Sequence, residues 1–145
     1  MAKVVSINIS SKKGIPKTPI QEGEFITNFG LKEDSHGGDW HRQVSLLAQE
    51  SIDKIKEMGM ENLSPGVFAE NITTEGICLY KLPIGAKMKI GESIHEVTQI
   101  GKQCHNRCKI FHTIGDCIMP KEGIFTKIIM GGCVKVGDII EVLKD

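Results

Sequence analysis

Apolar and β-branched residues occur along this chain in short runs, and glycine-rich or polar turns separate one run from the next. Short runs bounded by turn residues are typical of β-strands. The pattern therefore predicts strands over residues 3–9, 20–27, 43–47, 87–90, 95–100, 124–130 and 138–143, with two further apolar pieces at 68–74 and 79–85.

One segment, after the predicted strand at 43–47, has the spacing of a helix instead. Ile52, Ile55 and Met58 recur at intervals of three and would share a helical face, and Gly59 is a helix stop signal. Many short strands with one clear helix predict a predominantly β domain with a few helices, closed as a β-barrel.

The stretch from Gly30 to Arg42 has neither a strand period nor a helical one. It is polar and rich in glycine, and irregular loops of this kind in compact domains are usually functional. Its glycines let the backbone approach a ligand closely, and Arg42 with His36 and His41 suits an anionic group such as a phosphate. The alternatives are a solvated loop on which Trp40 packs down, and a pair of histidine metal ligands.

Length and charge narrow the classes of function. The chain has 145 residues, which fits one domain over residues 1–145. Lys plus Arg and Asp plus Glu both number 18, so no net positive field favours nucleic acid or an acidic membrane surface. No apolar run approaches the ~20 residues of a membrane span, and the start of the chain lacks a signal peptide's apolar region, so we expect a cytoplasmic protein.

The five cysteines are an odd number, and in a reducing compartment we expect thiols or metal ligands rather than a disulfide framework. Cys78 and Cys133 have aliphatic neighbours and are expected to be core thiols. The other three, Cys104, Cys108 and Cys117, lie in one polar segment over residues 102–117.

Positive residues surround the first two thiols of this segment. They are Lys102, His105, Arg107, Lys109 and His112. Positive neighbours lower the pKa of a thiol, which predicts a reactive thiolate at Cys104 or Cys108. Two alternatives stay open: buried thiols that act as small apolar side chains, and a zinc site built from Cys104, Cys108, His112 and Cys117, whose spacing fits structural zinc sites poorly.

Several motifs, in order along the chain, match a known family. They are Gly30-Leu31 followed by Asp34-Ser35-His36-Gly37-Gly38-Asp39, then Arg42-Gln43-Val44-Ser45-Leu46-Leu47, Pro65-Gly66-Val67-Phe68-Ala69-Glu70-Asn71-Ile72, Leu82-Pro83-Ile84-Gly85, and Val97-Thr98-Gln99 ahead of Cys104. They resemble the MOSC domain, named for the C-terminal domain of molybdenum cofactor sulfurase. The likeness runs from about residue 3 to residue 143 and is greatest to the small stand-alone bacterial members.

The resemblance implies a closed β-barrel that binds the molybdenum cofactor (molybdopterin). The cysteine that follows the family's Val-Thr-Gln motif falls on Cys104, which would carry sulfur as a persulfide or ligate the metal. Other branches have an Arg-Cys pair, which falls on Arg107 and Cys108, so both cysteines are candidates for the functional thiol. The implied cofactor-binding residues are His36, Gly37, Gly38, Arg42, Asn71 and Arg107.

Two functions follow from this resemblance. The first is a cofactor-binding and sulfur-carrier protein with a cysteine desulfurase as partner; the alternative is a molybdenum-cofactor-dependent reductase of small N-hydroxylated compounds. A flavin motif and a ferredoxin cysteine run are both missing from the sequence, so a reductase would need an external electron donor, which favours the first function. The family is also linked with pyridoxal phosphate binding. We further expect the 30–42 loop and the cysteine segment to line one pocket, where His36, Arg42 and Arg107 converge on an anion.

Overall fold

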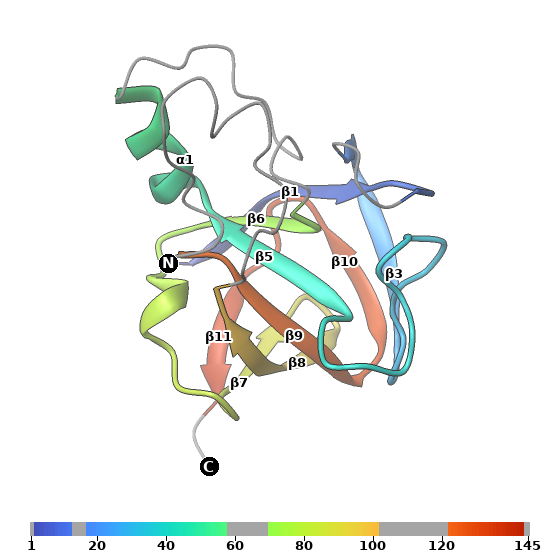
Figure 1. Cartoon of the computed structure of the whole chain (residues 1–145). Helices are drawn as coiled ribbons and strands as arrows, with labels where there is room; N and C mark the ends of the chain where they lie inside the picture. Colours follow the sequence, from blue (N-terminus) through green and yellow to red (C-terminus); the bar gives the residue numbers. More distant parts are fainter. Residues whose placement is uncertain (1, 13–16, 58–69, 102–121, 144–145) are drawn as a thin grey trace.

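The computed structural model describes residues 2–12, 17–57, 70–101 and 122–143 of the chain. These residues are mostly in strands, with one α-helix at the side of the sheets (Figure 1). The strands are β1 (Lys3–Ile9), β2 (Thr18–Ile20), β3 (Glu22–Ile26), β4 (Gly30–Leu31), β5 (Val44–Ala48), β6 (Ile72–Glu75), β7 (Lys87–Ile90), β8 (Ser93–Ile100), β9 (Ile124–Met130), β10 (Gly132–Lys135) and β11 (Ile140–Leu143). The helices are α1 (Gln49–Glu57) and a short 3-10 helix, η1 (Leu79–Lys81).

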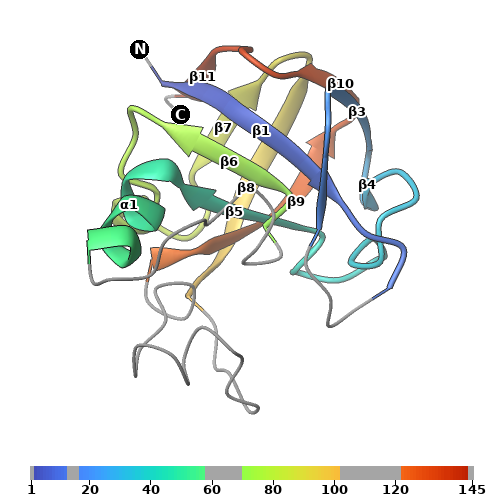
Figure 2. The same ribbon diagram turned by 90° about the horizontal axis from the view of Figure 1, so that it is seen from above.

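The strands form two sheets. The large sheet has the order β11-β7-β8-β9-β5-β6-β1-β2, and the small sheet has the order β10-β3-β4. In the large sheet β5 and β6 are parallel, which requires a crossover connection, and α1 belongs to that connection. Figure 2 shows β1, β6, β5 and β9 side by side, with α1 at one end of β5.

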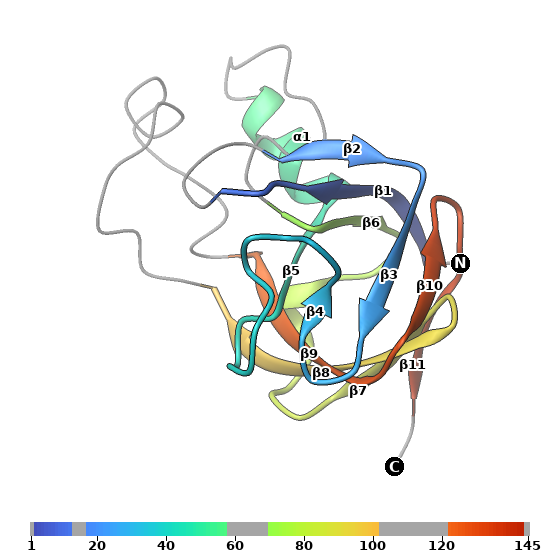
Figure 3. The same cartoon turned by 90° about the vertical axis from the view of Figure 1, so that its right-hand side faces the viewer.

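The predicted closed β-barrel is wrong, because the large sheet has two separate edges, β11 and β2, and neither sheet closes within the described residues. β2 is only three residues long, and the chain then turns into β3, which leaves the large sheet to pair with β10 and β4 (Figure 3). A single isolated bridge links Lys3 to Ile139, beside hydrogen bonds of 2.9 Å from the Val4 amide to the Asp138 carbonyl and 2.8 Å from the Gly137 amide to the Val4 carbonyl. This contact is too short to form a ladder, so the sheet is curled but open.

Most of the predicted strands are confirmed. The predictions at 3–9, 87–90 and 124–130 coincide with β1, β7 and β9, and those at 43–47, 95–100 and 138–143 agree with β5, β8 and β11 within two residues. The predicted strand at 20–27 is divided between β2 and β3, and the apolar piece at 79–85 begins with the 3-10 helix. The pattern did not predict β10, because the two glycines before Cys133 indicate a turn.

The predicted helix is confirmed as α1 up to Glu57, while Met58 and Gly59 lie outside the described residues. Ile52 is its buried contact with the rest of the protein, at 1% exposure. Neither described helix has the length and apolar character needed to cross a bilayer.

The core between the sheets is mainly aliphatic, in keeping with the 5% aromatic content, and Phe25 is the aromatic side chain of its buried cluster among the described residues. Its largest fully buried side chains include Ile7, Leu46, Ile72, Met88 and Ile124. Burying a side chain of this size stabilises the fold by roughly 1.5–3 kcal/mol each. These residues come from five different strands, so the core holds the large sheet in its curled form.

Cys78 and Cys133 are not core thiols, contrary to the prediction from their neighbours. Cys78 is exposed and Cys133 is partly exposed. Cys78 precedes η1, whose buried residue is Leu79, and Cys133 alternates along β10 with the buried Val134. In both places the adjacent aliphatic residue takes the inward position instead.

Candidate functional site

The predicted functional loop between β4 and β5 is irregular and is held together by its own backbone. The Gly37 amide donates to the Asp34 carbonyl at 3.1 Å, and the Gly38 amide donates to the Phe29 carbonyl at 2.8 Å. A Cβ atom at Gly37 would lie 2.4 Å from the Phe29 ring, so this position requires glycine for packing. Both glycine amides thus have partners within the protein, and a role for Gly37 and Gly38 in cofactor binding stays a prediction.

A buried ion pair anchors the start of this loop. The Lys17 ammonium lies 2.9 Å from Oδ1 and 3.1 Å from Oδ2 of Asp34, and both side chains are fully buried. The Ser10 amide donates to Asp34 Oδ1 at 3.0 Å, and the Ser10 hydroxyl oxygen accepts from Lys17 at 3.1 Å. Burial alone raises the pKa of Asp34, but hydrogen bonds from the His36 and Ser10 amides and from Lys17 outweigh it and hold that pKa well below its ordinary value.

His36 lies beside this ion pair rather than facing an open site. Its Nδ1 is 2.9 Å from the Lys17 ammonium and 3.7 Å from Asp34 Oδ2. An ammonium can only donate, so Nδ1 accepts and the imidazole carries its proton on Nε2. The His36 carbonyl accepts a hydrogen bond of 2.7 Å from the Trp40 indole. Trp40 therefore ties the two parts of the loop together, and anion binding by His36 stays a prediction.

The end of the loop is tied to the end of β8 through one side chain, Gln99. Gln99 Oε1 accepts a hydrogen bond of 2.9 Å from Arg42 Nε and lies 3.0 Å from His41 Nε2. The Thr98 hydroxyl contacts the His41 carbonyl and lies 3.1 Å from the Phe125 carbonyl. Two consecutive residues of β8 therefore fix two consecutive residues of the loop.

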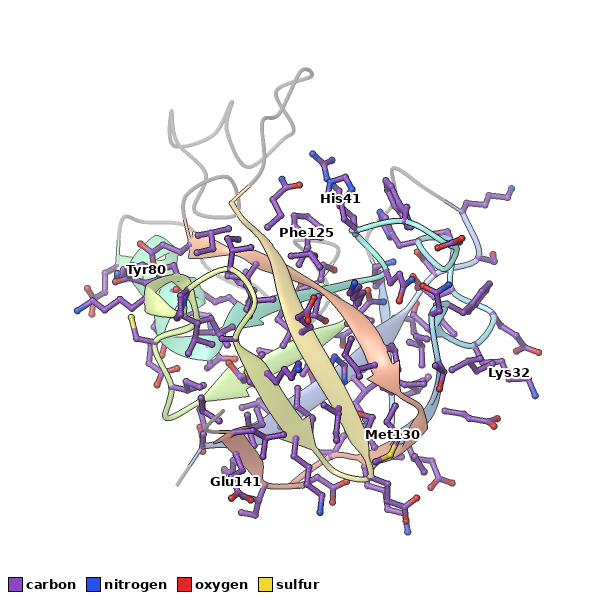
Figure 4. All side chains as sticks on the ribbon, turned by 90° about the horizontal axis from the view of Figure 1, so that it is seen from below. Lys32, His41, Tyr80, Phe125, Met130 and Glu141 are labelled. Atoms are coloured by element: carbon purple, nitrogen blue, oxygen red, sulfur yellow. The ribbon has the colours of Figure 1, made fainter. Side chains whose placement is uncertain are left out.

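Arg42 lies on the aromatic ring of Phe125, with 5.4 Å between its Cζ atom and the ring centroid. Phe125 is 3% exposed, so the ring is a fixed support for the guanidinium. Figure 4 places His41 and Phe125 at the same end of the molecule. Arg42 is half-buried, and no acidic side chain of the described residues forms an ion pair with it. A guanidinium in this state suits an anionic ligand.

Two described residues that flank the cysteine segment, Gly101 and Gly123, are hydrogen-bonded to each other next to Gln99. The Gln99 Nε2 donates to the Gly101 carbonyl at 2.7 Å, and the Gly101 amide donates to the Gly123 carbonyl at 2.6 Å. Residues 102–121 follow directly on Gly101 and lie outside the described residues. The predicted roles of Cys104, Arg107 and Cys108, the alternative zinc ligands His112 and Cys117, and the shared pocket therefore stay predictions.

Asn71 lies in the interior of the large sheet. Its Oδ1 accepts from the Ser45 amide at 3.0 Å, and its Nδ2 donates to the Asn8 carbonyl at 3.2 Å. These bonds link β1, β5 and the residue before β6. The two side-chain polar atoms of Asn71 thus have protein partners, and its predicted role in cofactor binding stays untested.

An open cavity of about 390 Å³ lies elsewhere, between the β7–β8 turn and the residues of β10 and β11. Its lining residues are Lys89, Gly91, Glu92, Cys133, Lys135, Asp138, Ile139 and Glu141. The lining mixes both signs of charge, and it includes none of the predicted site residues. We therefore take the Arg42–Gln99 contact, rather than this cavity, as the candidate functional site.

Sequence reasoning singled out Arg42 and His41 but missed Gln99 and Lys17 as organising residues. Gln99 had a signal, its place in the Val-Thr-Gln motif before the cysteines. Lys17 had none, because a lysine in a polar stretch beside Pro16 resembles an exposed loop residue.

Comparison with known proteins agrees with this architecture. A family model described as the MOSC domain matches residues 32–141. Among solved structures, YuaD from Bacillus subtilis superposes with a TM-score of 0.81 at 19% identity, over 97% of this chain and 94% of that one. YiiM from Geobacillus stearothermophilus superposes with a TM-score of 0.75 at 18% identity, over 99% and 76% of the two chains. YiiM from Escherichia coli gives 0.68 at 18% identity, over 99% and 70%. No curated protein matches the sequence.

Proposed function

This chain belongs to the MOSC domain family, and from that premise we propose that it binds the molybdenum cofactor (molybdopterin) and carries sulfur on Cys104. The family is linked with the molybdenum cofactor. The observation that carries the proposal is the joint attachment of His41 and Arg42 to Gln99, five residues before Cys104 in the sequence.

The residues of the candidate site fit the charged end of such a cofactor. Molybdopterin ends in a phosphate, and a half-buried guanidinium without a carboxylate partner among the described residues is a suitable donor for it. His41 is exposed next to Arg42. Its Nε2 contacts Gln99, and its other ring nitrogen, Nδ1, donates to an anion when the ring is protonated. In this proposal Arg42 and His41 hold the phosphate, and Phe125 supports the guanidinium from below. When bound, the cofactor supplies the redox and sulfur chemistry of molybdenum.

The proposed sulfur step uses only the thiol chemistry of this chain and of a partner. A cysteine desulfurase presents its sulfur as a persulfide, and the Cys104 thiolate attacks the terminal sulfur of that group. The new bond joins Cys104 Sγ to the transferred sulfur, the sulfur–sulfur bond of the donor breaks, and the donor cysteine leaves as a thiolate. No net oxidant or reductant is consumed, because one persulfide replaces another. The positive neighbours of Cys104 in the sequence favour the attacking thiolate.

Cofactor binding is tested on protein purified from a host that makes the molybdenum cofactor. We expect molybdenum by elemental analysis and fluorescent pterin after oxidation, in equal amounts. Arg42→Met should lose most of the pterin and Arg42→Lys should keep part of it, because Lys retains the charge without the two-pronged donor geometry. Lys32→Met is the matched control, since it removes one positive charge from an exposed side chain of the same loop.

Sulfur transfer is tested by incubating the protein with a cysteine desulfurase and free cysteine. Mass spectrometry should show one added sulfur atom on Cys104, absent from Cys104→Ser and retained in Cys108→Ser. The reverse result would assign the sulfur to Cys108. Protein that carries neither pterin nor sulfur, and instead holds one zinc ion per chain, would overturn the proposed function.

A further inference from the structure

We propose that Gln99 is a positioning residue, whose neutral amide oxygen holds Arg42 and His41 together for one phosphate-class anion while leaving the positive charge of Arg42 uncancelled. The inference rests on the function proposed above, since it concerns the same site. It adds the residue that organises the site and the reason for its chemical type.

The orientation of the Gln99 amide follows from its partners. Arg42 Nε can only donate, so the Gln99 atom that lies 2.9 Å from it is the oxygen. The same oxygen lies 3.0 Å from His41 Nε2, so that nitrogen donates as well. The Gln99 Nε2 donates to the Gly101 carbonyl at 2.7 Å, which holds the amide plane in place. Both acceptor positions of the oxygen are thereby used, one for each loop residue.

The charge of the acceptor distinguishes this contact from two ion pairs elsewhere in the protein. Three residues earlier on β8, Glu96 lies 3.5 Å from Lys127 and neutralises it. Lys54 likewise has a carboxylate partner, Glu122, at 3.0 Å. The acceptor for Arg42 is instead the neutral side-chain amide of Gln99. A glutamine therefore gives the fixed geometry of an ion pair while the site keeps its attraction for an anion.

Toward the described residues, the guanidinium of Arg42 keeps donors without a side-chain partner. Among the described residues, Arg42 donates its side-chain hydrogen bond from Nε, to Gln99. One face of the guanidinium rests on the Phe125 ring. The two Nη groups form the edge that binds phosphate oxygens in a two-pronged manner. Because the Nε contact and the ring fix the plane of the guanidinium, Gln99 and Phe125 together determine where that edge lies.

Isothermal titration with inorganic phosphate at low ionic strength tests this role on the full chain. Gln99→Glu keeps the shape of the side chain but adds a negative charge, and we expect phosphate affinity to fall about tenfold. Gln99→Met removes the acceptor without adding charge, and we expect a smaller loss, about threefold, from loosened orientation. Glu96→Gln is the matched control on the same strand, and it should not weaken phosphate binding.

A merely structural role for Gln99 would predict a different pattern. In that case Gln99→Glu and Gln99→Met would lower the midpoint of urea unfolding, and phosphate affinity would follow that loss of stability. The positioning role predicts instead that the salt dependence of phosphate binding becomes shallower in Gln99→Glu at unchanged stability. The Gln99→Met variant is the test that remains if Gln99→Glu does not fold.

The outcomes separate this inference from the proposed function. Wild-type protein that fails to bind phosphate, or binds it as well as Gln99→Glu does, overturns the role of Gln99 whatever the pterin content. Protein that carries no pterin but binds phosphate in a Gln99-dependent manner overturns the cofactor proposal and leaves the role of Gln99 in place.

Discussion

The ammonium of Lys17 and the carboxylate of Asp34 lie 2.9 Å apart, and neither side chain is exposed to solvent. The pair joins the residue before β2 to the start of the functional loop, across 17 positions of sequence. Because transfer of either charge from water is unfavourable, each residue needs the other in the folded protein. The loop between β4 and β5 is thus anchored at one end by an ion pair and at the other by Gln99.

Lys17→Met should destabilise the protein by about 3–5 kcal/mol, because it leaves the Asp34 carboxylate buried without its counter-charge. The measurement is urea unfolding followed by circular dichroism. Lys32→Met is the control, since Lys32 and Glu24 are both more than half exposed, and removal of an exposed pair changes stability by less than about 1 kcal/mol. Equal effects of the two substitutions would contradict the anchoring role of Lys17.

Acid should destabilise the protein through Asp34. Its pKa in the folded state is held below the ordinary value of 3.8, so the folded protein binds this proton less well than the unfolded chain does. The contribution is therefore complete above about pH 5 and is lost progressively as the pH falls further. Asp34→Asn should flatten this part of the stability curve, and Glu24→Gln, which removes an exposed carboxyl group, should not. The measurement is the urea midpoint at successive pH values from 5 down to 2.5, about the range over which a carboxyl group titrates.

Acidification should also destabilise the protein through His95, and this loss should begin at a higher pH than the loss through Asp34. Its ring is fully buried between Ser93, whose Oγ lies 2.9 Å from Nε2, and Thr126, whose Oγ1 lies 3.0 Å from Nδ1. The Ser93 hydroxyl donates to the Ile90 carbonyl, so His95 Nε2 carries a proton and Nδ1 accepts from Thr126. The ring is neutral in this arrangement, and burial lowers the pKa of His95 from 6.5 to about 3.

The sign of this effect follows from the lowered pKa. Below pH 6.5 the unfolded chain binds a proton at His95 that the folded protein does not bind. Stability should therefore fall by up to about 1.4 kcal/mol per pH unit as the pH decreases from 6.5. His95→Gln should remove this slope between pH 6 and 5, although its stability at neutral pH is lower, and the exposed His41→Gln should retain it. A slope that persists in His95→Gln would contradict the assignment.

Gly37→Ala should destabilise the loop, because the new methyl group would meet the Phe29 ring at 2.4 Å. Overpacking of this kind costs roughly 1–3 kcal/mol. Phe29→Leu combined with Gly37→Ala should recover part of that loss, since the smaller side chain leaves room for the methyl group. Thermal unfolding of the two single variants and the double variant provides the measurement, and strict additivity would contradict the proposed contact.

The elements that the sequence predicted well are those that local pattern determines. β1 and β9 are rich in β-branched and aromatic residues, β7 alternates lysine with apolar residues, and each lies where the pattern predicts it. The closure of the sheet was predicted wrongly, because it depends on pairings between distant strands. The three-residue length of β2 and the departure of β3 into the small sheet leave the large sheet open, and no local pattern of apolar residues encodes either.

The candidate site divides in the same way. Arg42 could be predicted, because an arginine in an irregular glycine-rich loop is a local signal. Its partner Gln99 is 57 positions away, and the contact exists only because β5, β9 and β8 are neighbours in the sheet. The Lys17–Asp34 pair likewise needs the folded chain to bring two loops together. Residue type therefore indicates which side chains can bind a ligand or react, while the strand order determines which of them lie next to each other.

The bridge between Lys3 and Ile139 also bears on the order of events during synthesis. β1 precedes β6 in the sequence, and it precedes the residues around Asp138 by a much longer stretch of chain. At about 5–20 residues per second, a ribosome needs of the order of ten seconds to travel from β1 to Asp138. During that interval both β2, which pairs with residues 7–9, and β6 are made and can pair with β1. The first residues of β1 therefore lack their contact with Asp138 and Ile139 until translation has passed that part of the chain, and the curled form of the large sheet is completed last.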